Sequence, residues 1–290
     1  MNYQDLKLLC RSASNRSYGD AAMMLQEEIF SLNKEELVEV IAEIGVIPED
    51  IDHDSKEEKI YTKVSDILFA KSLSEMGLQT EVLRERSDSA DIVAKSKFYG
   101  YSLVGDAKAF RLSRTAKNAK DFKVESMWYW RGVNDFSVLA CPYFQYPKKN
   151  SQVFKEALNR NVCLFSWEYL YIMLKANVCE TESFSLRDVW DQSNIIGSTT
   201  TIGNAKSSFL EMQSENIRKI IGVEYDDFYY LFNETRQKVI SRGNMEIDHC
   251  KAEIERIKGL DRESAVNQLL ETLNIESRIE TIQKTIDQMI

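Results

Sequence analysis

The alternation of apolar and polar residues predicts helices in the first quarter of the chain. Apolar positions recur at helical spacing in residues 1–30, again between Asn33 and Gly45, and again between Ser55 and Gly77. Asn33 and Ser55 each stand three residues before a glutamate, which is the pattern of a capping box at a helix start. The glycines mark where these helices end. The third helix is expected to bury one face, formed by Ile60, Val64, Ile67, Leu68 and Leu73.

Shorter apolar runs follow, and they predict strands that alternate with helices. Residues 91–107 contain two such runs joined by a polar connection with a glycine, which is typical of a β-hairpin. Helices are expected at 151–158 and 167–174. This alternation favours an α/β fold, with a central mixed β-sheet flanked by helices. The strands are predicted within 78–83, 91–107, 136–141 and 162–165.

The last third of the chain has the pattern of helices. Residues 192–205 are rich in polar and helix-breaking residues, so a linker or surface loop is expected there. We therefore divide the chain into a catalytic α/β core with N-terminal helices, 1–200, and a helical region, 201–290. The later helices could form a dimer interface, cover the sheet or embrace DNA. They are predicted near 206–220, 225–257, 262–272 and 276–289.

Composition restricts the class of protein. Of 290 residues, 43% are hydrophobic and 29% charged, which is typical of a soluble globular protein. No apolar run approaches the roughly 18 residues of a membrane span, and the N-terminus lacks a signal-peptide pattern. The five cysteines are scattered and have no CxxC spacing, which favours reduced thiols in a cytoplasm over a zinc site. With only two histidines, histidine-based hydrolase chemistry is poorly supplied.

The candidate chemistry lies at the end of one apolar run. Asp106 and Lys108 are two residues apart, so on a strand both side chains point to the same face. Asp91 opens the preceding apolar run, and a hairpin would bring it close to Asp106. Two carboxylates and a lysine in one place suit a hard divalent cation and a phosphodiester. A triplet of acid, any residue and lysine is weak by itself, because a surface ion pair at a strand end has the same pattern.

Charge is concentrated around this candidate site. The net charge of the chain is −9, but residues 95–123 hold eight basic and two acidic residues, a local charge of +6 that leaves −15 elsewhere. A basic patch of this kind is what phosphate contacts require. An isolated basic run is more often a solvated loop, and it is the position next to Asp106 and Lys108 that favours nucleic-acid binding.

Several segments together resemble type II restriction endonucleases of the PD-(D/E)xK nuclease superfamily, in order from about Leu32 to the C-terminus. The resemblance implies an α/β core, Mg²⁺ dependence, and a homodimer that cuts palindromic double-stranded DNA, with AAGCTT as the site. It also implies a DNA methyltransferase that acts on the same site without binding this chain. The segments are Asp106–Lys108, 111–118, 120–124, 144–147, 164–168 and 279–282.

Carried over residue by residue, the resemblance assigns Asp91 and Asp106 to the metal and Lys108 to catalysis. Ala90 stands where the superfamily motif has proline. Two further acids, Glu58 and Glu85, are candidates for the metal site, although Glu58 serves equally well as a helix cap. Lys108 would orient a metal-bound water and stabilise the charge that develops on phosphorus, leaving a 5′-phosphate and a 3′-hydroxyl.

The basic segment, residues 111–123, supplies the candidate DNA contacts. Asparagine can pair with adenine, lysine with guanine and aspartate with cytosine in the major groove, whereas lysine can also contact phosphate alone. A repair or recombination nuclease without base specificity would use the same catalytic residues and stays an alternative. A second alternative is a non-catalytic DNA-binding dimer, but the presence of all three catalytic residues argues against it. The DNA-binding candidates are Arg114, Lys117, Asn118, Lys120, Asp121 and Lys123.

Overall fold

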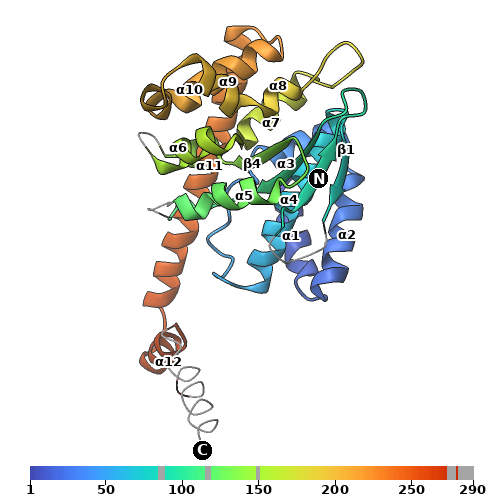
Figure 1. Ribbon diagram of the computed structural model, residues 1–290. Coiled ribbons are helices and arrows are strands. Elements are labelled where there is room, and N and C mark those ends of the chain that lie inside the picture. The colour runs from blue at the N-terminus through green and yellow to red at the C-terminus, as the bar shows by residue number, and fades with distance from the viewer. Residues whose placement is uncertain (84–88, 115–118, 148–150, 273–278, 280–290) are drawn as a thin grey trace, which may run out of the picture. The chain divides into compact units, whose positions relative to one another are not determined.

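The computed structural model, which describes residues 1–83, 89–114, 119–147, 151–272 and 279, contains a five-stranded mixed sheet (Figure 1). The strand order is β1-β2-β3-β4-β5, with antiparallel pairing from β1 to β3 and parallel pairing from β3 to β5. The predicted α/β class with a mixed sheet is confirmed. The strands are β1 (Gln79–Val82), β2 (Ile92–Lys95), β3 (Ser102–Ala107), β4 (Phe136–Cys141) and β5 (Val162–Ser166).

Helices cover the sheet, and helices also follow it along the chain as far as Thr272. The chain forms two compact units, Met1–Gly243 and Asn244–Ile290, and the described part of the second is helical. Two short 3₁₀ helices, η1 (Ala119–Phe122) and η2 (Tyr143–Gln145), join larger elements. The α-helices are α1 (Tyr3–Ala13), α2 (Tyr18–Phe30), α3 (Lys34–Ile41), α4 (Lys56–Glu75), α5 (Val124–Trp130), α6 (Gln152–Arg160), α7 (Trp167–Lys175), α8 (Arg187–Trp190), α9 (Gln192–Thr199), α10 (Ile202–Ile220), α11 (Tyr225–Lys258) and α12 (Arg262–Thr272).

Each face of the sheet contributes to a separate hydrophobic core, because successive side chains of a strand point to opposite faces. In β4, Val138 and Ala140 join the core that contains α1, α2, α3, α4 and α7. Leu139 and Cys141 join the core that contains α5, α6 and α10. The result is a three-layer arrangement in which the sheet is covered on both faces (Figure 1).

The predicted hairpin forms between β2 and β3, with Ile92 opposite Gly105. Gly105 lies where α4 crosses the sheet, and a Cβ atom there would stand 2.7 Å from Phe69 of α4 and 2.7 Å from Ile92. No side chain fits in that space, so β3 requires glycine at this point. The close approach brings α4 next to the end of β3 that carries Asp106.

The helix starts were predicted well and the buried surfaces less so. Asn33 forms a reciprocal capping box with Glu36, and the Ser55 side chain accepts from the Glu58 backbone as expected. The carboxylate of Glu58 turns instead to the backbone N–H of Asp54, 2.7 Å away, so the second box is only half formed. The five apolar residues of α4 are buried as expected, but burial extends beyond that face, because α1, α2 and the sheet cover almost all of the helix.

The prediction of a linker or surface loop at 192–205 was wrong. Helix α9 occupies 192–199, and α10 begins at Ile202. Ile196 is fully buried, and the Ser193 hydroxyl, also buried, donates to the Val162 carbonyl at 2.6 Å. Polar residues are therefore compatible with a buried helix here, since the neighbouring strand accepts their hydrogen bonds. Of the helix predicted near 276–289, only Ile279 belongs to the described residues.

Two predictions from composition can be compared with the structure. Within the described ranges, no helix is long and apolar enough to cross a membrane. All five cysteines are free, and Cys10, Cys141 and Cys163 are buried. Burial raises the pKa of the Cys10 thiol to about 12, so this group is held as a neutral core side chain.

Candidate active site

Three carboxylates from three elements meet at the end of the β2–β3 hairpin. Asp66 comes from α4, Asp91 directly precedes β2, and Asp106 is the penultimate residue of β3. Each offers an oxygen within 4.8 Å of the others. The backbone N–H of Asp91 donates to the Gly105 carbonyl at 3.1 Å, which continues the hairpin by one residue and holds Asp91 beside Asp106. The hairpin thus creates the juxtaposition that the sequence suggested.

Asp66 was missed by the sequence reasoning. Its side chain is 6% exposed, and its carboxylate accepts from the Ala107 N–H at 3.3 Å. The pairing of β2 with β3 ends at Gly105, so the Ala107 N–H has no partner on β2. The Asp66 carboxylate accepts this hydrogen bond in place of a strand carbonyl. An acid within the apolar run from Val64 to Phe69 was the available signal, because a buried carboxylate requires partners.

Two lysines balance part of this negative charge. Lys108 Nζ pairs with Asp106 Oδ2, and its side chain is only 15% exposed. Lys63 of α4 is also buried, and its Nζ donates to the Leu83 carbonyl at 3.0 Å. Lys63 was not predicted either. Three carboxylates against two ammonium groups leave the site one negative charge in excess if all are ionised.

The electrostatics of the cluster oppose that full ionisation. Burial, followed by the charges of Asp91 and Asp106, raises the pKa of Asp66 well above its ordinary value. Burial and then repulsion by Asp106 raise the pKa of Asp91 to about 6. Burial lowers the pKa of Lys108, but the attraction of Asp106 outweighs it and the net pKa is raised. A hard divalent cation coordinated by carboxylate oxygens would relieve this repulsion, so the three acids fit Mg²⁺.

Glu58 lies apart from the three carboxylates. It precedes Asp66 by eight residues in α4, which is about 12 Å along a helix. Its Oε1 accepts from Arg111 at 2.8 Å, and its Oε2 accepts from the Asp54 N–H. These contacts tie the start of α4 to the loop before it and to Arg111. Glu85, the other candidate acid, lies outside the described residues.

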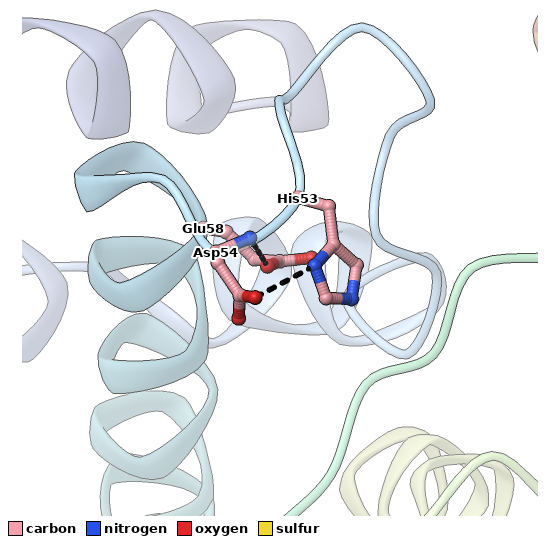
Figure 2. Close-up of side chains that lie close together, drawn as sticks. All are labelled: His53, Asp54 and Glu58. Atoms are coloured by element: carbon pink, nitrogen blue, oxygen red, sulfur yellow. Dashed lines mark hydrogen bonds and ion pairs between the residues drawn. The ribbon is translucent and has the colours of Figure 1, made fainter. Parts of the chain in front are cut away.

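Figure 2 shows a second group of possible ligands around Glu58, formed with His53 and Asp54. His53 Nδ1 lies 3.1 Å from the Asp54 carboxylate, and both side chains are exposed, at 77% and 85%. Asp54 has a left-handed backbone, with φ of 59°, in the turn before α4. The contacts of this group are those of a surface turn that caps a helix, and the buried cluster is the better site for a cation.

The basic segment passes close to the hydrophobic core that contains α5, α6 and α10. Phe122, in η1, is fully buried and stacks on Tyr146 with ring centroids 5.3 Å apart. Lys120 and Lys123, on either side of this anchor, are exposed. Lys123 has a left-handed backbone, with φ of 46°, at the junction with α5. The anchor therefore presents both lysines to the exterior.

The remaining DNA-binding candidates divide into two sets. Arg114 Nη2 and Asp121 Oδ1 form an ion pair at 2.6 Å, so the acid that was predicted to read a base is held by a neighbouring cation. Arg114 also stacks over the ring of Phe110, 5.7 Å from its centroid. Lys117 and Asn118 lie outside the described residues.

Comparison with known proteins extends over the whole of this site. The model of the HindIII restriction endonuclease family matches residues 3–286. The type II restriction enzyme HindIII of Haemophilus influenzae is 36% identical over 283 residues, which cover 98% of this chain and 94% of that enzyme. The matched region includes all the described carboxylates of the cluster and the basic segment.

Proposed function

The chain belongs to the HindIII restriction endonuclease family and is a type II site-specific endonuclease, and we propose that it hydrolyses palindromic double-stranded DNA with Mg²⁺ as cofactor. The AAGCTT site is part of the proposal, as are a PD-(D/E)xK active site and products with 5′-phosphate and 3′-hydroxyl ends. The observation that carries it is the buried cluster of Asp66, Asp91 and Asp106 with Lys108 beside it.

The three carboxylates would hold Mg²⁺, which when bound lowers the pKa of a coordinated water and offsets the charge of the phosphate. Lys108 orients the attacking water and stabilises the negative charge that develops on the phosphate oxygens. Asp106 holds the ammonium group of Lys108 through their ion pair. Because Lys108 directly follows β3 and pairs with Asp106, the cation and the ammonium group would approach the same phosphate.

DNA recognition is proposed for the basic segment. Asn118, Lys120, Asp121 and Lys123 would include the residues that read bases, and Lys117 would contact phosphate. Arg114 fixes the orientation of the Asp121 carboxylate through their ion pair, which fits a side chain that must be placed accurately against a base edge.

A palindromic site presents two equivalent half-sites, and a homodimer matches them. We propose that the helical region 201–290 supplies the dimerisation or DNA-embracing surface. The cellular setting that follows is a prokaryotic cytoplasm, where a DNA methyltransferase protects the same site.

Two variants test the catalytic assignment. Asp106→Asn and Lys108→Ala are expected to abolish cutting while specific DNA binding is retained, because neither residue is needed to read a base. The measurements are single-turnover cleavage and a gel shift with the AAGCTT duplex. Lys71→Ala is the matched control, since Lys71 is also a mostly buried lysine paired with a carboxylate, 2.6 Å from Glu75. A Lys108→Ala protein that cuts at the wild-type rate would disprove the assignment.

The specificity is tested by sequencing the ends produced from a phage genome. Ends that all derive from AAGCTT are expected. Ends from a different palindrome would refute the proposed site alone, and ends without a common sequence would support a non-specific nuclease with the same active site.

A further inference from the structure

Trp167 contacts the catalytic strand from a distant element. It is the first residue of α7, which begins directly after β5, whereas β3 lies two strands away in the sheet. Its indole Nε1 donates to the carbonyl oxygen of Lys108 at 2.9 Å. The Trp167 side chain is almost completely buried, and it lies in the segment 164–168 to which the sequence analysis gave no function.

The backbone of Lys108 is held on both sides by this contact and one other. Its N–H donates to the Ala140 carbonyl of β4 at 2.7 Å. The pairing of β3 with β4 ends one residue earlier, at Ala107 and Ala140, so no strand residue is registered opposite Lys108. The indole therefore fixes a peptide group that lies just past the regular ladder, and with it the direction in which the Lys108 side chain leaves the backbone.

The indole has little freedom to move. It packs edge-to-face against Phe69 of α4, with ring centroids 6.3 Å apart. On another side it touches Gly45, where a Cβ atom would stand 2.9 Å from the Trp167 ring and 2.8 Å from Pro142. Gly45 was interpreted as a helix stop, but the structure gives it a second reason, namely space for this ring. A rigid donor is what a precise placement of Lys108 requires.

We propose that Trp167 is a positioning residue that acts through the Lys108 backbone to aim the ammonium group at the scissile phosphate. The inference rests on the proposed catalytic role of Lys108. A small displacement of a catalytic group slows the chemical step strongly while leaving the rest of the interface intact. The loss of the indole N–H should therefore affect the cleavage rate and spare the affinity for DNA.

The test compares two variants that each lose one buried indole hydrogen bond. Trp167→Phe removes the donor to Lys108. Trp190→Phe removes the donor to the hydroxyl of Tyr101, 3.1 Å away, next to the opposite end of β3. The single-turnover rate of Trp167→Phe should fall by about 10–100-fold, since a misplacement of about 1 Å can cost about 100-fold in rate. Affinity for the AAGCTT duplex, measured with Ca²⁺ in place of Mg²⁺, should not change, and Trp190→Phe should match wild type in both.

Two results of this test would overturn the inference. A Trp167→Phe rate within about twofold of the Trp190→Phe rate overturns the inference. An equal loss of DNA binding and cutting also overturns it, because a positioning role predicts a loss of rate alone. If the phenylalanine variant does not fold, benzothienylalanine at position 167 keeps the ring shape without the N–H, and the same rate criterion applies. Failure of the proposed function is separate, since Lys108→Ala would then cut normally.

Discussion

Removal of one carboxylate from the cluster is expected to stabilise the metal-free protein while destroying its activity. Asp91 lies beside Asp66 and Asp106, and its pKa is raised from 3.8 to about 6, first by burial and then by Asp106. In Asp91→Asn the amide has no charge to desolvate, and it can still hydrogen-bond to a neighbouring carboxylate. The variant tests whether the cluster is as strained electrostatically as its geometry indicates.

The sign and size follow from linkage between protonation and folding. The pKa of Asp91 is higher in the folded chain, so its contribution to stability is complete below about pH 4 and is lost as the pH rises through about 6. The difference between 3.8 and about 6 corresponds to about 3 kcal/mol at 1.36 kcal/mol per pH unit. Asp91→Asn should therefore raise the free energy of unfolding by up to about 3 kcal/mol at about pH 8, and by almost nothing at about pH 4.

The assay is urea denaturation of both proteins in EDTA at the two pH values. Asp135→Asn serves as the control, because Asp135 is an exposed acid that accepts from the Ser102 N–H, at 2.9 Å, near the other end of β3. Addition of Mg²⁺ should stabilise wild type more than Asp91→Asn, since the cation offsets the repulsion that the variant has already removed. An Asp91→Asn protein that is less stable than wild type at about pH 8 without metal would refute the reasoning.

Four further outcomes are expected. Sedimentation should show a dimer at working concentration, and a monomer both with and without DNA would exclude the proposed assembly. Lys117→Ala should weaken binding to cognate and random DNA equally, whereas Asn118→Ala should lose about 1–3 kcal/mol of discrimination at one base pair; an unchanged preference at every position would refute base reading. Glu180→Ala should cost at least about 2 kcal/mol in denaturation, because the buried carboxylate accepts from Tyr101, Ser96 and the Leu186 N–H; a neutral result would show that water replaces it.

The sequence by itself determined the strand that carries the chemistry. The two-residue period of extended backbone places Asp106, in β3, and Lys108, directly after it, on the same face, whatever surrounds them. The hairpin was equally local, since Gly100 has the left-handed backbone, with φ of 64°, that a tight connection favours. The capping residues Asn33 and Ser55 likewise act within their own helices. Each of these features depends on residues that are close together in the chain.

The sequence pattern failed where a helix is buried on more than one side. The polar residues of 192–205 suggested a loop, yet α9 forms there, and the buried Ser193 hydroxyl donates to a carbonyl of β5. The apolar pattern of α4 indicated one buried face, whereas Asp66 lies on a part of the helix surface that is also buried. Periodicity describes a single element and its average environment, so it cannot show which polar group will meet a partner on another element.

Only the tertiary structure decided how the catalytic strand is completed. Asp66 reaches the Ala107 N–H because Gly105 has no side chain, so α4 can pack closely against β3. Trp167 reaches Lys108 because Gly45 leaves room for its ring. Both contacts depend on how closely two elements far apart in sequence can pack, and that distance is set by side-chain volumes on both partners at once. The residue pattern of a single segment therefore cannot predict this packing distance.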